Sequence, residues 1–134
     1  MDWNSVAYSR TTSRLGRRLI RDRRTKPLHV SWSHHAFMRA SERAEWTPQQ
    51  CRLWFQGARY LGRWARNEHW GDEDWVIGGI RDKKKHGRFT IITFMPRAYW
   101  DHDVVRYDKM MQDLEIRDHQ GAVQHGQEEN HLHS

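Results

Sequence analysis

The chain has 134 residues, enough for one domain, and its hydrophobic fraction of 37% is offset by eight Trp, four Tyr and four Phe that each bury a large area. The single cysteine, Cys51, excludes an internal disulfide and a cysteine-built zinc site. No apolar run approaches the ~20 residues that span a bilayer, and the start lacks the apolar core of a secretory signal, so we expect a cytoplasmic protein without membrane contact.

The net charge of +6 is unevenly distributed. Residues 1–100 hold 20 Lys and Arg against nine acids, whereas residues 101–134 hold three against eight. A basic body predicts a polyanionic partner such as RNA. A charge that only keeps the chain soluble is the alternative.

Residues 1–27 form a basic arm that Pro27 ends. An arm that orders on an RNA or DNA backbone is one interpretation, and a solvated tail is the other. The candidate phosphate contacts in this arm are Arg14, Arg17, Arg18 and Arg21.

Two helices follow a short extended entry at 29–32. Ser33 is a suitable N-cap for a helix over 34–44. Thr47, Pro48 and Gln50 predict a second helix with a capping box. We favour its end near Gly57, with a strand over 59–65; continuation to Arg66 is the alternative.

Residues 67–74 are predicted to be an acidic loop, and 75–81 and 88–95 to be strands rich in β-branched and aromatic residues. The loop 83–87 joins these strands as a hairpin. Its lysines either touch phosphate or are ordinary turn residues, and the candidate contacts are Lys83, Lys84, Lys85 and Arg88.

The end of the chain is acidic and polar. Residues 101–115 are predicted to be a helix whose apolar positions serve either docking or a protein partner. Residues 117–134 hold four histidines at spacings that match no compact metal site, and we expect a disordered tail. The predicted fold is α+β: two N-terminal helices packed on a small antiparallel sheet, with a domain over 28–100 between the arm 1–27 and the acidic segment 101–134.

The helix over 34–44 also carries the candidate chemistry. At about 100° per residue, His35, Arg39 and Arg43 fall within roughly one quadrant, beside a packing sector that contains Ala36 and Ala40. Imidazole carries protons near neutral pH, and guanidinium forks match phosphate oxygens. A shift in helix phase would replace His35 by His34, and the arginines have Glu42 and Glu45 as possible ion-pair partners.

The pattern Ser33-x-His35-Ala36-x-x-Arg39-x-x-x-Arg43, followed by a capped helix and by strands that end Ile91-Ile92-Thr93-Phe94-Met95-Pro96, resembles the small RNase toxins of the barnase–EndoU–colicin–RelE superfamily. It is closest to the BrnT-like branch, found in bacteria and phages, and covers about residues 30–100. The resemblance implies a fold of two helices on a curved sheet and metal-independent, cofactor-free cleavage of RNA. By position, His35, Arg39, Arg43 and Thr93 match the motif, whereas the arm and the acidic tail lie outside it.

The leading hypothesis is therefore a toxin-type endoribonuclease with RNA as its substrate and an antitoxin or host enzyme as a possible partner of the 101–115 helix. Tyr99 or Trp100 is expected to stack an unpaired base. A second proton carrier is not identified, and His69 and His86 are weak candidates. The alternatives are a phage or bacterial inhibitor that binds a host protein, and plain nucleic-acid binding.

Overall fold

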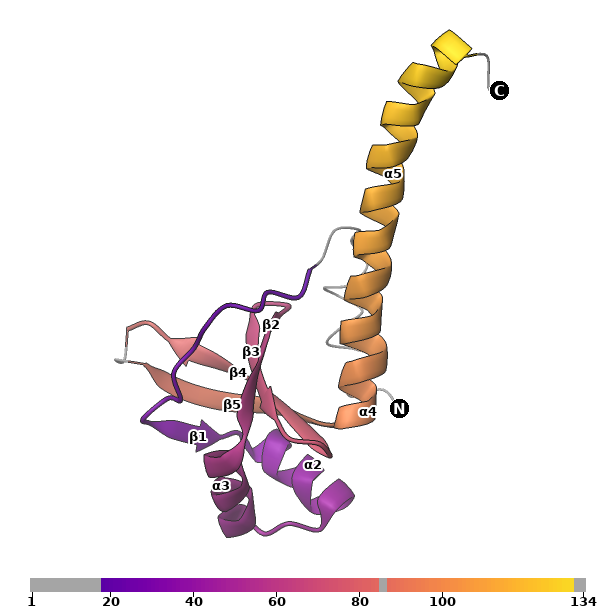
Figure 1. Ribbon diagram of the computed structural model, residues 1–134. Coiled ribbons are helices and arrows are strands. Elements are labelled where there is room, and N and C mark those ends of the chain that lie inside the picture. The colour runs from indigo at the N-terminus through magenta and orange to yellow at the C-terminus, as the bar shows by residue number, and fades with distance from the viewer. Residues whose placement is uncertain (1–17, 85–86, 132–134) are drawn as a thin grey trace.

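The computed structural model describes residues 18–84 and 87–131, which fold around one five-stranded sheet (Figure 1). The strand order is β1-β5-β4-β3-β2, with β1 parallel to β5 and every other pair antiparallel. The strands are β1 (Val30–Trp32), β2 (Arg59–Trp64), β3 (Asn67–Gly71), β4 (Trp75–Asp82) and β5 (Arg88–Pro96). The α+β class is confirmed, but the sheet is mixed rather than antiparallel, and β1 precedes the helices.

Helices α2 (His34–Ala44) and α3 (Pro48–Gly57) begin at the caps that the sequence predicts. The Ser33 hydroxyl accepts the N–H of Ala36 at 3.1 Å, and Thr47 and Gln50 form a reciprocal capping box. These bonds satisfy backbone donors that the first turn of a helix leaves open. The predicted end of the second helix at Gly57 is also confirmed.

Two apolar cores lie on opposite faces of the sheet. On one face, α2 and α3 bury Ala36, Ala40, Cys51 and Phe55 against strand residues such as Phe89. On the other face lie α4 (Arg97–Trp100), a π-helical turn (Asp101–Val105) and the start of α5 (Arg106–His131). The second core contains Leu19, Trp64, Val76, Met95, Trp100 and Val104.

Residues 18–27, which the sequence assigned to the basic arm, pack onto the folded body. Leu19 and Pro27 are buried, and Ile20 pairs with Arg63 of β2 through two backbone hydrogen bonds of 3.0 and 2.8 Å. Lys26 donates to the carbonyls of Phe55 and Gln56 at the C-terminal end of α3. A cation is favoured there because helix C-termini carry partial negative charge.

The prediction of an acidic loop over 67–74 is wrong in its first half. Residues 67–71 form β3, which follows β2 through the two-residue turn Ala65-Arg66. Both turn residues have positive φ, 54° and 69°, as a tight hairpin of this type requires. Glu68, His69 and Trp70 are buried, so this strand, which lies between β2 and β4, belongs to the interior of the fold.

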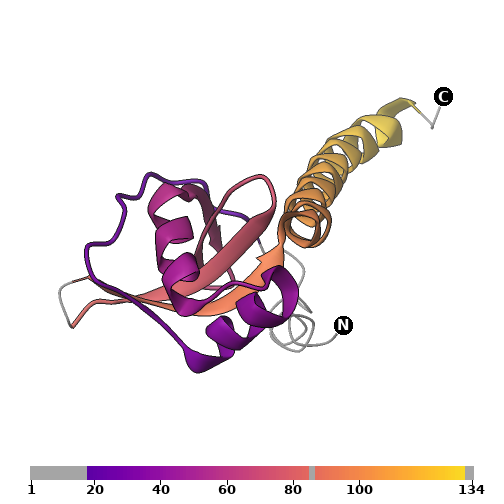
Figure 2. The same cartoon turned by 90° about the horizontal axis from the view of Figure 1, so that it is seen from below.

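The acidic segment after residue 100 is also part of the fold. Val104 and Met111 are buried, and Tyr107 packs edge-on against Trp64 with ring centroids 5.7 Å apart. The docking interpretation therefore holds for this part of the helix. Beyond it, α5 projects away from the body as one helix to His131, where a disordered tail was expected (Figures 1 and 2). In the described residues, no helix has the length and apolar character needed to cross a membrane.

Candidate nucleic-acid interface

Helix α2 presents a cationic flank made of His35, Arg39 and Arg43. Ala36 and Ala40 are fully buried, so the sheet-facing side of the helix is fixed. His35 and Arg39 directly precede the buried alanines in the sequence, and Arg43 lies one turn further along the helix. All three therefore lie to one side of the packing face. His35 is exposed, and Arg39 and Arg43 are half-buried.

The cationic flank faces away from α3. The opposite side of α2 lines a hollow of about 710 Å³ with the residues that lead into α3, and it contributes His34, Phe37, Met38 and Ser41. Helix α2 packs over β5, and α3 packs over strands further along the sheet, such as β3. The cationic flank therefore faces the side of the sheet where β5 lies. There β1 pairs only with Phe89–Ile91, so no described strand covers residues 92–96 of β5 on that side.

The two arginines of the flank are close enough to repel each other. Partial burial lowers the pKa of Arg43 below its usual value, and the positive charge of Arg39 lowers it further. Arg39 also pairs with Glu42, with 3.1 Å between Nη1 and Oε2. An anion next to the flank would relieve the repulsion between the two guanidiniums, so their placement favours binding of a phosphate.

Thr93 does not join this flank, because its side chain lies on the other face of the sheet. Gly78 pairs with both Thr93 and His69 in the sheet register. An ideal Cβ on Gly78 would lie 2.6 Å from Thr93 Oγ1 and 2.8 Å from His69 Nε2, whereas one on Gly79 would meet the ring of Phe89 in the first core. Thr93 thus points into the second core.

A bulge in β5 explains this reversal. Gly78 pairs with Thr93 and Gly79 with Ile91, which leaves Ile92 without a partner in the register. Side chains alternate along a strand, so Phe89 and Ile91 would place Thr93 on the α2 face; the extra residue turns it to the opposite one. The Thr93 hydroxyl is buried and has no hydrogen bond in the described part of the chain.

His69 is not available as a second proton carrier. It is fully buried, and its ring lies 4.6 Å from that of Trp100. Burial lowers the pKa of His69 to about 3, so the ring is neutral at ordinary pH. Nδ1 lies 3.1 Å from the carbonyl oxygen of Asn67, which can only accept, so Nδ1 carries the proton and Nε2 is left as an acceptor. His86 lies outside the described residues.

The other predicted contacts are dispersed. Arg14, Arg17 and Lys85 lie outside the described residues. Arg18 pairs with Asp108 and Glu115. Arg21, Lys83, Lys84 and Arg88 are exposed.

The aromatic candidates for base stacking are largely used within the fold. Tyr99 packs against the second core, and burial, helped by Asp103, raises its pKa to about 12. Trp100 is 1% exposed, so its predicted role in stacking a base is wrong.

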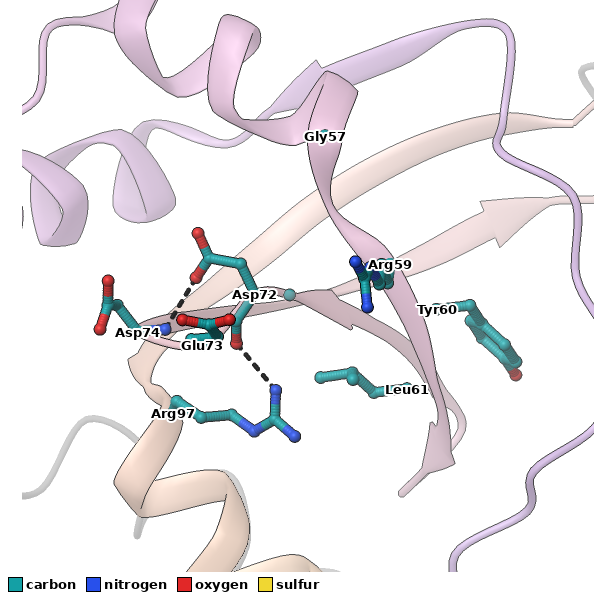
Figure 3. Close-up of a pocket in the computed structure, with 9 residues that line it drawn as sticks. Gly57, Arg59, Tyr60, Leu61, Asp72, Glu73, Asp74 and Arg97 are labelled. Atoms are coloured by element: carbon teal, nitrogen blue, oxygen red, sulfur yellow. Dashed lines mark hydrogen bonds between the residues drawn. The ribbon is translucent and has the colours of Figure 1, made fainter.

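A second hollow, of about 460 Å³, lies between the start of β2 and the β3–β4 turn (Figure 3). Arg97 donates to the carbonyl oxygen of Asp72 at 2.8 Å, and the Asp72 carboxylate accepts N–H groups from Trp54, Asp74 and Trp75. These donors outweigh burial and lower the pKa of Asp72. The hydrogen bonds of the Asp72 carboxylate therefore stabilise the β3–β4 turn. The described residues contain no cluster of His, Cys, Asp and Glu suited to a metal.

Comparison with protein-family models, with curated proteins and with solved structures gives no match for this chain.

Proposed function

We propose that this protein is an RNA-binding endoribonuclease that uses the cationic flank of α2. The observation that carries the proposal is the close placement of Arg39 and Arg43 beside an exposed histidine, on the side of α2 that faces away from α3. The resemblance to RNase toxins adds support from the order of the motif residues. The basic body supplies the long-range attraction that brings a polyanion to this side.

The reaction that fits these residues needs no metal. The RNA 2′-oxygen attacks the adjacent phosphorus as its proton passes to His35, and the bond from phosphorus to the 5′-oxygen breaks. The leaving oxygen takes a proton from water. Arg39 and Arg43 hold the phosphate and stabilise the charge that builds up on its oxygens. Thr93 has no part in this scheme because it lies on the other face of the sheet.

The test compares purified wild-type protein with His35→Ala and Arg39→Ala on RNA in the presence of EDTA. We expect cleavage to fall by about 10²–10⁴-fold without the proton carrier and by about 10²–10³-fold without the donor. His34→Ala is the matched control, because His34 lies on the side of α2 that faces the hollow near α3. Equal losses in all three variants, or RNA left intact by the wild type, would refute the proposal.

A protein-binding function through α5 is the second candidate. Met110 and Leu114 lie one turn apart on α5 and are 49% and 38% exposed, so they form a small apolar surface with acidic residues around it. A basic protein with an apolar groove would match this surface. Leu114→Glu should abolish such binding and leave RNA cleavage unchanged, and retention of the partner by that variant would exclude the candidate.

A further inference from the structure

A cationic hollow of about 370 Å³ lies at the end of the sheet that carries the β2–β3 and β4–β5 turns. It forms where the β2–β3 turn, the end of β4 and the β4–β5 connection meet the chain segment before β1. Five cations and two carboxylates are among the residues that line it: Arg24, Arg63, Arg66, Arg81, Lys83, Glu68 and Asp82. The hollow therefore carries a local excess of positive charge.

A buried carboxylate orients one side of the hollow. Glu68 of β3 has a side chain only 5% exposed, and Arg81 binds it through two N–H···O bonds, Nε at 2.8 Å and Nη2 at 2.9 Å. Arg24 Nη1 lies 3.9 Å from the same carboxylate. A two-point contact of this kind fixes the plane of the guanidinium, so Arg81 is held in place before any ligand arrives.

A second carboxylate orients the other side. Asp22 accepts the Nε–H groups of Arg24 and Arg63 at 2.9 and 3.1 Å. It also accepts the hydroxyl of Tyr60, whose pKa is raised by burial and by Asp22. Within the described residues, the Nη groups of Arg24 and Arg63 make no hydrogen bond, so these donors stay available to an anion.

Two further cations stand at the rim. Arg66 and Lys83 are exposed, and neither forms an ion pair in residues 18–84 and 87–131. Arg66 is held in the β2–β3 turn, where its φ is 69°. Lys83 follows β4, and Gly87, with φ of 79°, closes the connection by donating its N–H to the carbonyl of Asp82 at 3.3 Å. The backbone thus presents both cations from the same end of the sheet.

We propose that this hollow binds a backbone phosphate of single-stranded RNA. Arginine forks match phosphate oxygens in shape and charge, and the two acids that orient them are already neutralised by Arg24, Arg63 and Arg81. The choice of RNA as the polyanion rests on the proposed function, whereas the hollow itself is separate from the α2 flank. It would hold a neighbouring part of the strand that reaches α2.

Binding of a short single-stranded RNA, measured by fluorescence anisotropy over a range of salt concentrations, tests this proposal. The His35→Ala background keeps the RNA uncut. In the double variant Arg66→Gln/Lys83→Gln, the slope of log affinity against log salt should become shallower by about 0.7, the contribution of the one phosphate that the hollow neutralises. At about 0.1 M salt the affinity should fall by about 5-fold.

Arg59→Gln/Lys109→Gln is the matched control, since it removes the same charge from two exposed residues outside the hollow. An equal change of slope in the control would overturn the proposal. Titration with inorganic phosphate, followed by amide NMR signals of the hollow, is a second arm. Phosphate binding with an unchanged RNA slope would assign the hollow to a free anion and also overturn it. If the salt slope changes as expected but the protein with His35 in place cuts no RNA, the result would support RNA binding in the hollow and refute the ribonuclease proposal.

Discussion

Replacing His69 should remove a large part of the acid sensitivity of this protein. The side chain is fully buried beside Trp100, and burial lowers its pKa to about 3 in the folded state. In the unfolded chain, histidine titrates near 6.5. Below about pH 6.5 the unfolded state therefore binds a proton at this histidine, whereas the folded state does not. The free energy of unfolding falls as the pH is lowered from about 6.5 towards about 3.

The size of this effect follows from the difference between the two pKa values. Each pH unit below 6.5 costs about 1.4 kcal/mol per proton, so lowering the pH from 7 to 5 should cost about 2 kcal/mol through His69. In His69→Phe that contribution is absent. The variant should thus lose about 2 kcal/mol less than wild type between these two pH values, whatever its stability at pH 7.

Urea unfolding at pH 7 and pH 5 measures the four free energies. Met111→Leu is the control, because it alters a buried side chain without a titratable group and should keep the wild-type pH dependence. The same loss in His69→Phe as in wild type would refute the buried, neutral state of His69.

Three further variants test the packing. Gly78→Ala should destabilise the fold by about 1–3 kcal/mol in urea unfolding, since the added Cβ would meet two side chains, whereas Gly57→Ala, with nothing within 4 Å, should not; equal effects would contradict the register. Ser33→Ala should cost about 1 kcal/mol through the lost cap, and an unchanged midpoint would argue against it. Lys26→Met should lower the Tm by removing the cation from the end of α3, and an unchanged Tm would show that this contact contributes nothing.

The sequence predicts elements that depend on local chemistry. The caps Ser33 and Thr47, the helix end at Gly57 and the strands β4 and β5 all follow from residues within one turn or one strand of the feature concerned. In each case the preferred backbone and the bonded partner are neighbours in the chain. These elements form where the sequence predicts them because no contact with a distant part of the chain opposes the local preference.

The sequence did not predict β3 because the contacts that stabilise this strand come from residues far away in the chain. The Ala65-Arg66 turn lacks the Gly or Asn that usually marks a tight hairpin. Glu68 makes the segment look solvent-exposed, and its burial depends on Arg81, Arg24 and the indole N–H of Trp70. A buried carboxylate of this kind is stable only with its partners in place, and the local sequence does not name them.

The candidate site was predicted in part for a related reason. His35, Arg39 and Arg43 share one helix, so helical periodicity is enough to place them together. Thr93 was assigned to the same site through the strand, and one unpaired residue at Ile92 turned it to the other face. The cationic hollow joins four segments of the chain. The sequence predicted one of its residues, Lys83, as a phosphate contact, but no local pattern links that loop to the arginines of β2 and its turn.

The chemistry of the RNA ends produced in EDTA tests the ribonuclease proposal most directly. Attack by the 2′-oxygen leaves a 2′,3′-cyclic phosphate on one fragment and a free 5′-hydroxyl on the other, and mass spectrometry of a defined oligonucleotide distinguishes these ends. We predict these products with wild type and with His34→Ala, and almost none with His35→Ala. Fragments with a 5′-phosphate, or equal cleavage by the His35→Ala variant, would contradict a cleavage site on the α2 flank.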